Sequence, residues 1–378
     1  MKLHKPLLDA ILNALHKIIH ENFYSDKVLE HLFKSNKKLG KRDRQIIAET
    51  TYNIIRYYYY FQHITNSNDH EKILNAYLQN PNIDLNIPAD KRITLSFNND
   101  LWTIAEQQLG KEKWLREAEA LNQSAPLVIR TNTLKTSKHQ LQSRLKEIGI
   151  ETIENQDVPE ALIITNKKFL TQNEWFQSGH YEFQDLSSQK VAHFIPYDIL
   201  QSAHRIIDAC AGAGGKTLHL SALKNNKGQI IAMDIDQKKL QELKKRCRRA
   251  GCTNVQTKLI DSSKTIKRLE NSADILLIDA PCTGTGVIKR KPDTKLKFTI
   301  SNMNELLKLQ QNILSSYSKM LKTNGYLLYV TCSILPAENE QQVQTFLNNN
   351  PNYQLIKQTT LYPSNGFDGF YMALLKKQ

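Results

Sequence analysis

Hydrophobic residues recur at three- and four-residue spacing through the first third of the chain. In the opening stretch this stripe comprises Leu7, Leu8, Ile11, Leu12, Leu15, Ile18 and Ile19. Such spacing places apolar side chains on one face of a helix. The stretch GKRDRQIIAETTYNIIRYYYYFQHI repeats the pattern behind a basic lead. We therefore predict an all-helical N-terminal domain over residues 1–122.

The pattern changes between residues 123 and 184. PLVIRTNTL alternates apolar and polar residues like a strand, and EALIIT and GHYEFQD are typical of further strands. Between them, SKHQLQSRLKEIGI has helical spacing, and Ser137 is placed to cap its N-terminus. These segments predict a small α/β module.

From residue 185 onward, short apolar runs alternate with helical stretches. The runs are HRIIDAC, GQIIAMDID, NVQTKLID, ADILLIDAP and GYLLYVTCS. Continuous apolar strands separated by helices indicate a mostly parallel, doubly wound sheet that is covered on both faces. The final segment, YQLIKQTTLYPSNGFDGFYMALLKKQ, predicts an antiparallel pair at the edge of that sheet. Residues 185–378 are therefore expected to form one α/β domain.

A glycine-rich loop, DACAGAGGKT, follows the first of these strands at residues 208–217. Its last three residues resemble a Walker phosphate loop, but Cys210 occupies the position of the first Walker glycine. The dinucleotide fingerprint GxGxxG also fails, because Thr217 stands where its third glycine belongs. The remaining pattern is a strand, a tight turn and a helix start, which lets a ligand approach the main chain closely.

An aspartate stands at or just beyond the end of each of four successive strands. They are Asp208, Asp234, Asp261 and Asp279. Ligands of doubly wound sheets bind outside the carboxyl ends of the strands, and an acid about 20 residues past the loop contacts a ribose. Capping of a helix explains one such aspartate but not four. Repeated carboxylates repel a triphosphate, whereas they suit a nucleoside with a cationic tail, such as S-adenosylmethionine.

The five cysteines are Cys210, Cys247, Cys252, Cys282 and Cys332. They are odd in number and form no CxxC pair, so we expect no zinc site, no other metal and no disulfide framework. A reducing cytoplasm fits this usage. Cys247 and Cys252 fit a helix packing role, but Cys282 and Cys332 directly follow two strands, where catalytic groups of parallel sheets gather.

A thiol beside a methyl donor has a specific chemical meaning. Carbon 5 of a pyrimidine is a weak nucleophile, but a thiolate that adds to carbon 6 makes it an enamine carbon that can attack a methyl group. A carboxyl group on the polar edge of the ring would stabilise the adduct. The basic residues Lys289, Arg290 and Lys291 would help keep a thiol ionised.

Charge and hydropathy fit this interpretation without requiring it. The chain carries 51 Lys and Arg against 37 Asp and Glu, a net charge of +14. Clustered cations gain affinity for nucleic acid by releasing counterions, although a basic enzyme without a nucleic-acid partner is equally compatible. No signal peptide and no run of about 18 apolar residues is visible, so a membrane span is not expected.

Four segments together are similar to one known family. DACAGAGGKT, AMDID, DAPCTGTGVIKRKPD and TCSILPAENE resemble the RNA cytosine-5 methyltransferases of the bacterial Sun/RsmB and eukaryotic NOP/NSUN type. The resemblance covers about residues 123–378 and implies a Rossmann-like class I methyltransferase core behind a small RNA-binding module. KRDRQIIAETTYNIIR resembles the NusB-like helical domain of the rRNA-specific bacterial members.

The resemblance also implies roles for individual residues. Cys332, in TCS, is similar to the nucleophile, and Cys282, in DAPC, to the thiol that assists release. Asp279 and Lys216 correspond to residues near the reacting base, and Asp279 also faces the cofactor. The remaining positions resembling the S-adenosylmethionine site are Cys210, Ala211, Gly212, Ala213, Gly214, Gly215, Asp234 (ribose) and Asp261 (adenine).

RNA contacts are expected from Arg130 in the small module and from Lys289 and Arg290. The chain departs from the family at Gly212-Ala213, where most members have Ala-Pro. We expect a cytoplasmic monomer that methylates rRNA, with small-subunit rRNA preferred. The alternatives are the same chemistry on tRNA, an RNA-binding assembly factor without catalysis, and a nicotinamide dehydrogenase, which would leave both cysteines unexplained.

Overall fold

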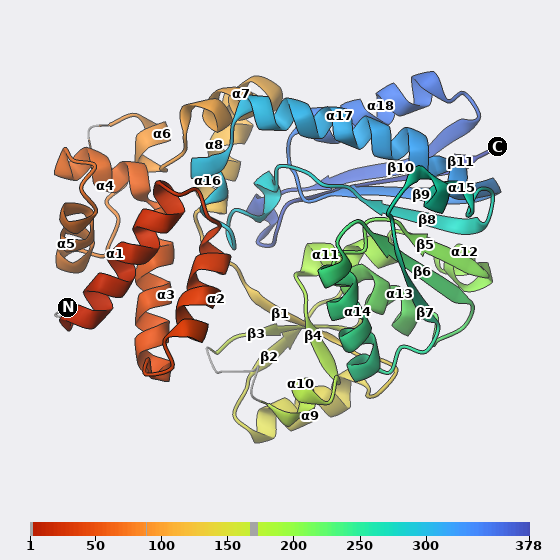
Figure 1. Ribbon diagram of the computed structural model, residues 1–378, viewed down its shortest axis with the longest axis horizontal. Coiled ribbons are helices and arrows are strands. Elements are labelled where there is room, and N and C mark those ends of the chain that lie inside the picture. The colour runs from red at the N-terminus through yellow and green to blue at the C-terminus, as the bar shows by residue number, and fades with distance from the viewer. Residues whose placement is uncertain (1–2, 88, 167–172) are drawn as a thin grey trace. The chain divides into compact units, whose positions relative to one another are not determined.

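The computed structural model describes residues 3–87, 89–166 and 173–378. The chain packs as two compact units, each made of two segments (Figure 1). The first unit contains Met1–Ser124 and Thr283–Asn304, and the second contains Ala125–Cys282 and Glu305–Gln378. The first unit is helical, whereas the second contains both sheets.

The helical unit is built around an apolar core. Its helices are α1 (Lys5–Ile19), α2 (Ser25–Ser35), α3 (Lys41–Arg56), α4 (Tyr58–Thr65), α5 (His70–Gln79), α6 (Lys91–Thr94), α7 (Asn99–Leu109) and α8 (Lys111–Leu121). On α1 the predicted stripe faces inward, with Ile11 and Leu15 fully buried. Burial of this stripe, rather than intrinsic helix propensity, holds helices of this length together.

The segment Thr283–Asn304 lies with these helices, although its sequence separates two strands of the large sheet. It contains the 3-10 turn η1 (Thr285–Val287), α16 (Thr294–Lys297) and the start of α17. Lys295 is fully buried, and its ammonium donates to the carbonyls of Arg56 (2.5 Å) and Leu95 (2.9 Å) and to Oδ1 of Asn122 (2.7 Å). The carboxylate of Asp293 accepts from the backbone and hydroxyl of Ser25, both at 3.0 Å. Polar contacts therefore hold this segment against the start of α2 and against the C-terminal ends of α3, α6 and α8.

The small module contains a four-stranded antiparallel sheet in the order β2-β3-β1-β4. Its elements are β1 (Leu127–Thr131), α9 (Lys138–Glu147), β2 (Thr152–Glu154), β3 (Ala161–Ile164), α10 (Glu174–Gln177) and β4 (Tyr181–Phe183). The predicted helix α9 begins at the expected residue. The Ser137 hydroxyl accepts from the backbone N–H of Gln140, and the Gln140 side chain accepts from the backbone N–H of Ser137, which forms a capping box.

The large sheet has the order β10-β11-β9-β8-β5-β6-β7. Its strands are β5 (Arg205–Asp208), β6 (Gln229–Asp234), β7 (Val255–Leu259), β8 (Ala273–Asp279), β9 (Leu321–Thr331), β10 (Tyr353–Leu361) and β11 (Phe370–Lys377). The five from β5 to β9 pair in parallel, and β10 and β11 add the predicted antiparallel edge. The fold class predicted from the sequence is confirmed.

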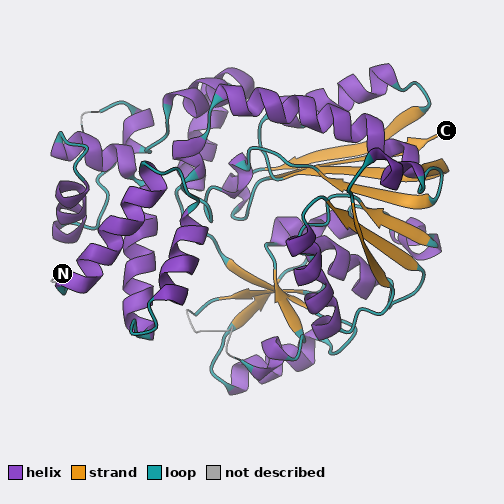
Figure 2. Cartoon of the chain, viewed as in Figure 1, coloured by secondary structure: helices purple, strands orange, loops and turns teal. Residues whose placement is uncertain are grey.

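Helices cover both faces of this sheet (Figure 2). They are α11 (Leu186–His193), α12 (Tyr197–Ser202), α13 (Gly215–Leu223), α14 (Gln237–Ala250), α15 (Ser263–Lys267), α17 (Ile300–Tyr317) and α18 (Glu340–Asn349), with 3-10 turns η2 (Ser318–Met320), η3 (Pro336–Glu338) and η4 (Pro363–Asn365). Within β6, Ile231 and Met233 join the core on one face, whereas Ala232 packs against α13 and α14 on the other. This two-residue alternation explains why the strand reads as a continuous apolar run. Among the described helices, none has both the length and the apolar character that a membrane span needs.

Candidate active site

The glycine loop connects β5 to α13, and its shape depends on two left-handed glycines. Gly212 has φ +54° and Gly214 has φ +87°. A Cβ on Gly214 would lie 2.6 Å from Cγ of Leu243, so packing as well as backbone conformation requires glycine there. A Cβ on Gly212 would meet nothing within 4 Å. The main chain at Gly212 therefore borders open space, as a loop that a ligand approaches must.

Asp234 ties this loop to the end of β6. Its Oδ2 accepts from the backbone N–H of Gly212 at 2.8 Å, and its Oδ1 accepts from that of Asp236 at 2.8 Å. The carboxylate is 8% exposed. The residue predicted to bind a ribose thus lies directly at the open edge of the loop.

Asp208, the acid at the end of β5, points into the protein. It is buried, and its Oδ2 accepts from the hydroxyl of Thr217 at 2.6 Å. Burial raises its pKa to about 7. Asp208 therefore stabilises the first turn of α13 through its hydrogen bond to Thr217. Unlike Asp234, it does not contact the glycine loop at Gly212.

Asp261 lies two residues beyond β7 and is exposed. Its Oδ1 accepts from the hydroxyls of Thr265 (2.6 Å) and Ser262 (3.1 Å), and these hydrogen bonds lower its pKa. These contacts stabilise the first turn of α15. The predicted contact of Asp261 with adenine stays a prediction.

Lys216 and Asp279 form an ion pair across the loop and the end of β8. The ammonium nitrogen lies 2.6 Å from Oδ2 of Asp279. Burial alone would lower the pKa of Lys216, but the charge and hydrogen bond of Asp279 outweigh burial and raise it. The Lys216 ammonium also lies 5.3 Å from the ring centre of Phe370 on β11. Two residues 63 positions apart therefore form one charged centre at the strand ends.

The two cysteines singled out in the sequence come together beside this pair. β8 and β9 are neighbours in parallel register, with Asp279 opposite Val330. The Sγ atoms of Cys282 and Cys332 lie 3.3 Å apart, and neither cysteine forms a disulfide. A negative charge on Cys332 would add to the effect of Asp279 and raise the pKa of Lys216 further.

A buried polar network fixes the loops that carry these cysteines. The Gln310 amide donates to the carbonyl of Pro281 (3.0 Å) and to the carboxylate of Glu338 (3.1 Å). Asn339 accepts from the hydroxyl of Thr331 (2.5 Å) and donates to the carbonyl of Ser333 (3.0 Å). Glu338 and Asn339 belong to the quoted motif TCSILPAENE, whereas Gln310 on α17 was not predicted. A helix glutamine carries no sequence signal for this role.

The RNA-contacting residues predicted from the sequence are placed differently. Arg130 is 2% exposed, and its guanidinium donates to the carbonyl of Gly215 at 2.8 Å and to Gln184. Lys289 is also 2% exposed, and its carbonyl accepts from Arg56. Both side chains are buried among protein groups, and their contact with RNA stays a prediction. Arg290 is half-buried, and its RNA contact stays a prediction.

One group among the described residues has the composition of a metal site, namely Glu160, His193 and His219. Both oxygens of Glu160 lie 3.0 Å from Nε2 of His193, and one lies 3.2 Å from Nε2 of His219. Burial would raise the pKa of Glu160, but the two imidazoles outweigh it and lower the pKa. Hydrogen bonding accounts for this arrangement. No sequence pattern predicts it, because the three residues are far apart in the chain.

Comparisons with known proteins agree with this geometry. The profile of the 16S rRNA methyltransferase RsmB/F family matches residues 199–376, and that of the RsmF/B-like ferredoxin-like domain matches residues 101–169. A probable ribosomal RNA small subunit methyltransferase B of Synechocystis is 33% identical over 77% of this chain and 70% of its own. The chain belongs to the RsmB/F methyltransferase family.

Two further comparisons define how far the likeness extends. The ribosomal RNA small subunit methyltransferase B of Pasteurella multocida is 33% identical over 73% of this chain, which spans 64% of that relative's length. The crystal structure of PH0851 superposes over all of both chains with a TM-score of 0.80 at 23% identity, which supports the fold. Membership of the RsmB/F family confirms the expected methyltransferase core and the expected cofactor, S-adenosylmethionine.

Proposed function

We propose that the protein is an RNA cytosine-5 methyltransferase that methylates a cytosine of small-subunit rRNA through a covalent cysteine adduct. The observation that carries this proposal is the pair of thiols of Cys282 and Cys332, 3.3 Å apart, beside the Lys216–Asp279 ion pair. A methyltransferase that modifies oxygen or nitrogen atoms needs no thiol, because those atoms are nucleophiles already. Two thiols at the ends of adjacent strands are accounted for by a carbon nucleophile that must first be activated.

The residues around the glycine loop fit S-adenosylmethionine. The loop from Cys210 to Lys216 would hold the methionine part, Asp234 the ribose and Asp261 the adenine. The open space at Gly212 and the carboxylate of Asp234 beside it support this placement. When bound, the cofactor supplies a methyl group on a positively charged sulfur, ready for attack by carbon.

The proposed reaction starts with a cytosine that has left its base stack. The Cys332 thiolate adds to carbon 6, and the electron pair of the 5,6 double bond makes carbon 5 nucleophilic. Carbon 5 would then attack the methyl group, whose bond to the cofactor sulfur would break, leaving S-adenosylhomocysteine. Cys282 assists removal of the proton from carbon 5, after which the bond between carbon 6 and Cys332 breaks. The double bond is restored and Cys332 leaves as a thiolate.

Asp279 and Lys216 would act on the polar edge of the base. A carboxyl at this edge hydrogen-bonds the ring nitrogen and amino group and so stabilises charge that develops on the adduct. The ammonium of Lys216, held 2.6 Å from Asp279, keeps the carboxylate in position and offsets its charge. The pair is built before substrate arrives, which avoids reorganisation during the reaction.

The choice of small-subunit rRNA rests on the relatives, whose names specify ribosomal RNA small subunit methyltransferases. The net charge of +14 supports a polyanionic partner of this kind. A tRNA substrate remains the alternative within the same chemistry. An assembly factor without catalysis is disfavoured by the intact cysteine and aspartate positions. The cytoplasmic location and monomeric state stay predictions from the sequence.

Methyl transfer from labelled S-adenosylmethionine to rRNA and, separately, to tRNA tests this proposal. Wild type, Cys332→Ala, Cys282→Ala and Cys252→Ala are compared, the last as a control thiol outside the site. We expect Cys332→Ala to be inactive, and Cys282→Ala to accumulate a protein–RNA adduct on a denaturing gel. Cys252→Ala should match wild type, and the modified base should be 5-methylcytosine.

Three results would count against the proposal. Full activity of Cys332→Ala would remove the covalent mechanism. Methylation of tRNA but not rRNA would move the substrate to the alternative. A wild-type protein that binds RNA but methylates none would favour the assembly factor.

A further inference from the structure

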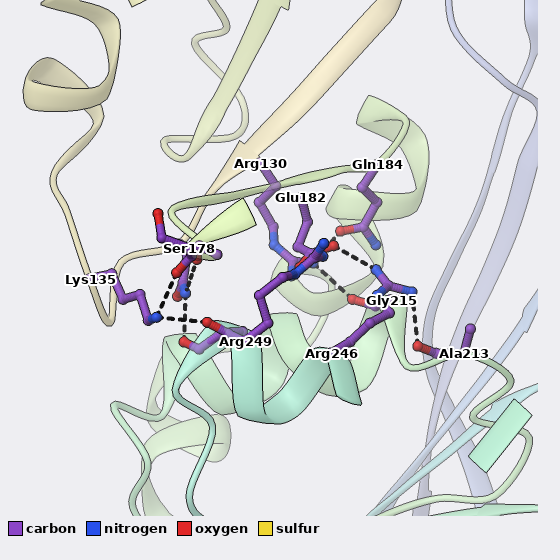
Figure 3. Close-up of polar contacts among 12 residues, drawn as sticks. Arg130, Lys135, Ser178, Glu182, Gln184, Ala213, Gly215, Arg246 and Arg249 are labelled. Carbon is purple, nitrogen blue, oxygen red and sulfur yellow. Dashed lines mark hydrogen bonds and ion pairs between the residues drawn. The ribbon is translucent and has the colours of Figure 1, made fainter. Parts of the chain in front are cut away.

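A cluster of charged residues joins the small sheet to the glycine loop (Figure 3). Arg130 on β1 and Glu182 on β4 are directly opposite each other in the strand register. Their side chains therefore leave the sheet on the same face. Glu182 pairs with Arg246 and Arg249, which come from α14 of the methyltransferase core, and Arg130 donates to the carbonyl of Gly215 at the start of α13. All four side chains belong to the second unit of the chain.

Arg246 contacts the small sheet and the glycine loop at once. One end of its guanidinium donates to the carbonyl of Ala213 at 2.8 Å, and the other end donates to Oε2 of Glu182 at 2.9 Å. The planar fork of arginine can hold two acceptors in fixed directions, which a lysine ammonium cannot reproduce. Glu182 is only 3% exposed, so water screens this ion pair weakly.

Arg130 holds the same loop two residues further along the chain. Its guanidinium donates to the carbonyl of Gly215 at 2.8 Å, and burial lowers its pKa to about 10, so it stays charged at neutral pH. Two carbonyls of the loop, at Ala213 and Gly215, are therefore held by arginines, while the amide of Gly212 is held by Asp234. We call Arg130, Glu182 and Arg246 the arginine latch.

The loop needs such support because of its own composition. Its glycines at positions 212 and 214 occupy left-handed conformations, and glycine loses more conformational freedom on ordering than any other residue. A flexible loop loses conformational entropy when a ligand orders it, and this loss reduces the affinity. Holding its carbonyls on one side leaves its open edge at Gly212 preorganised for a ligand.

The small module and α14 are also joined by hydrogen bonds near the C-terminal end of α14. The Asn132 amide donates to the carbonyls of Gly179 and Ala250, both at 2.7 Å, and Lys135 donates to the carbonyl of Arg249 at 2.6 Å. At Gly179 a Cβ would lie 2.2 Å from the Arg249 carbonyl oxygen, so the backbones touch. The small sheet is thus docked firmly enough to transmit a positional constraint to the loop.

We propose that the arginine latch makes the small sheet part of the cofactor site, with Arg246, anchored by Glu182, positioning the glycine loop for S-adenosylmethionine. Arg246 and Arg130 are positioning residues, since they reach the cofactor only through the loop's main chain. The proposal rests on the proposed function, because it assumes that this loop binds that cofactor. The small module, which the sequence predicts to bind RNA, would then also control the affinity for the cofactor.

Binding of S-adenosylhomocysteine, measured by titration calorimetry on the full chain without RNA, tests the latch. Arg246→Lys keeps the charge but cannot hold Ala213 and Glu182 together, and it should weaken binding about tenfold. Glu182→Gln keeps the shape but removes the anchoring charge, and it should weaken binding in the same direction. Arg249→Lys is the matched control, because Arg249 shares Glu182 and the same helix but donates to no loop carbonyl.

A kinetic readout separates positioning from a general loss of structure. Arg246→Lys should raise KM for S-adenosylmethionine while kcat at saturating cofactor stays near wild type, the pattern of lost ground-state and transition-state binding. Equal affinity of Arg246→Lys and wild type would overturn the latch. So would an equal weakening in Arg249→Lys, because that result reports loosened packing. Failure of wild type to bind S-adenosylhomocysteine would instead overturn the proposed function, and the latch with it.

Discussion

The Sγ atom of Cys282 lies 3.3 Å from that of Cys332, at the carboxyl ends of two adjacent parallel strands. Parallel register brings the two residues together from positions 50 apart in the sequence. The separation is small enough for the thiols to react with each other as well as with a substrate. Their proximity therefore predicts that oxidants inactivate the site by joining these two cysteines. Cys247 and Cys252 lie outside the site, so their oxidation should not have this effect.

Mild oxidation should reversibly abolish the proposed methyl transfer. Hydrogen peroxide would remove two electrons and two protons from Cys282 and Cys332, forming a disulfide and two molecules of water. Peptide mass spectrometry should find the two cysteines linked, and methyl transfer should be lost and then restored by dithiothreitol. Cys252→Ala should respond as wild type does. Inactivation that persists after reduction, or without the cross-link, would contradict this expectation.

Replacing Lys216 should impair catalysis more than it impairs RNA binding. Lys216→Met leaves the Asp279 carboxylate without its ion-pair partner at 2.6 Å. Loss of one preorganised electrostatic contact costs about 100-fold in kcat in well-studied enzymes. Single-turnover methyl transfer and filter binding of RNA measure the two quantities separately. Lys238→Met, on the exposed surface of α14, is the control, and a parallel loss there would point to nonspecific charge effects.

Asp208 should make the protein less stable as the pH rises. Its carboxyl has an ordinary pKa near 4 in the unfolded chain and about 7 when folded, because it is buried. The folded state therefore binds the extra proton, and the resulting stability is present at low pH and lost as the pH rises from 4 through 7. Asp208→Asn should become more stable relative to wild type between pH 5 and pH 8, by an amount on the order of 1–4 kcal/mol. Urea unfolding at both pH values measures this difference, and a pH-independent difference would refute it.

His219 should make the protein less stable as the pH falls. Burial lowers its pKa to about 3, whereas the unfolded residue takes up a proton near pH 6.5. The unfolded state therefore binds more protons below pH 6.5, and stability falls as the pH decreases from there toward 3. His219→Gln should reduce the loss of stability between pH 7 and pH 5. An exposed histidine, His139, replaced in the same way, should leave that loss unchanged.

Lys295 should be essential to the stability of the helical unit. Its ammonium donates to three acceptors, and Lys295→Met would remove this donor from the Arg56 carbonyl and from Oδ1 of Asn122. The Leu95 carbonyl would keep only the Asn122 side-chain amide as its donor. The expected cost is about 2–5 kcal/mol in unfolding free energy. Lys291→Met, in the same segment but exposed, should cost little. Similar unfolding curves for both variants would show that the buried contacts contribute nothing measurable.

Short-range patterns predicted much of this molecule. The continuous apolar runs predicted the parallel sheet, and Ser137 marked a helix start that the structure confirms. The positions of Cys282 and Cys332 after two strands predicted that both would reach one edge, which depends only on the strands being neighbours. In each case the signal lies within a few residues and the fold supplies the rest.

Long-range polar partners were beyond reach of the same reasoning. Arg130 reads as a surface cation on a strand, but its guanidinium turns inward to Gly215, because Glu182 and the loop carbonyl compensate its burial. Arg246 is one of several basic residues in a helix that has an exposed basic face, and nothing in the sequence separates it from its neighbours. Such roles depend on which backbone carbonyl lies within 3 Å, which spacing along the chain does not encode.

The division of the helical unit between two stretches of chain has a consequence for synthesis. The ribosome completes Met1–Ser124 first, yet Asp293 and Lys295, which cap and anchor these helices, emerge only after the small sheet and most of the parallel strands. At ordinary rates of translation this delay is roughly 10–40 s. During that interval the Arg56 carbonyl lacks the ammonium of Lys295, and the start of α2 at Ser25 lacks the carboxylate of Asp293, so the helical unit cannot yet be complete. Synthesis of the helical unit therefore begins before that of the second unit and ends only after most of the second unit has been made.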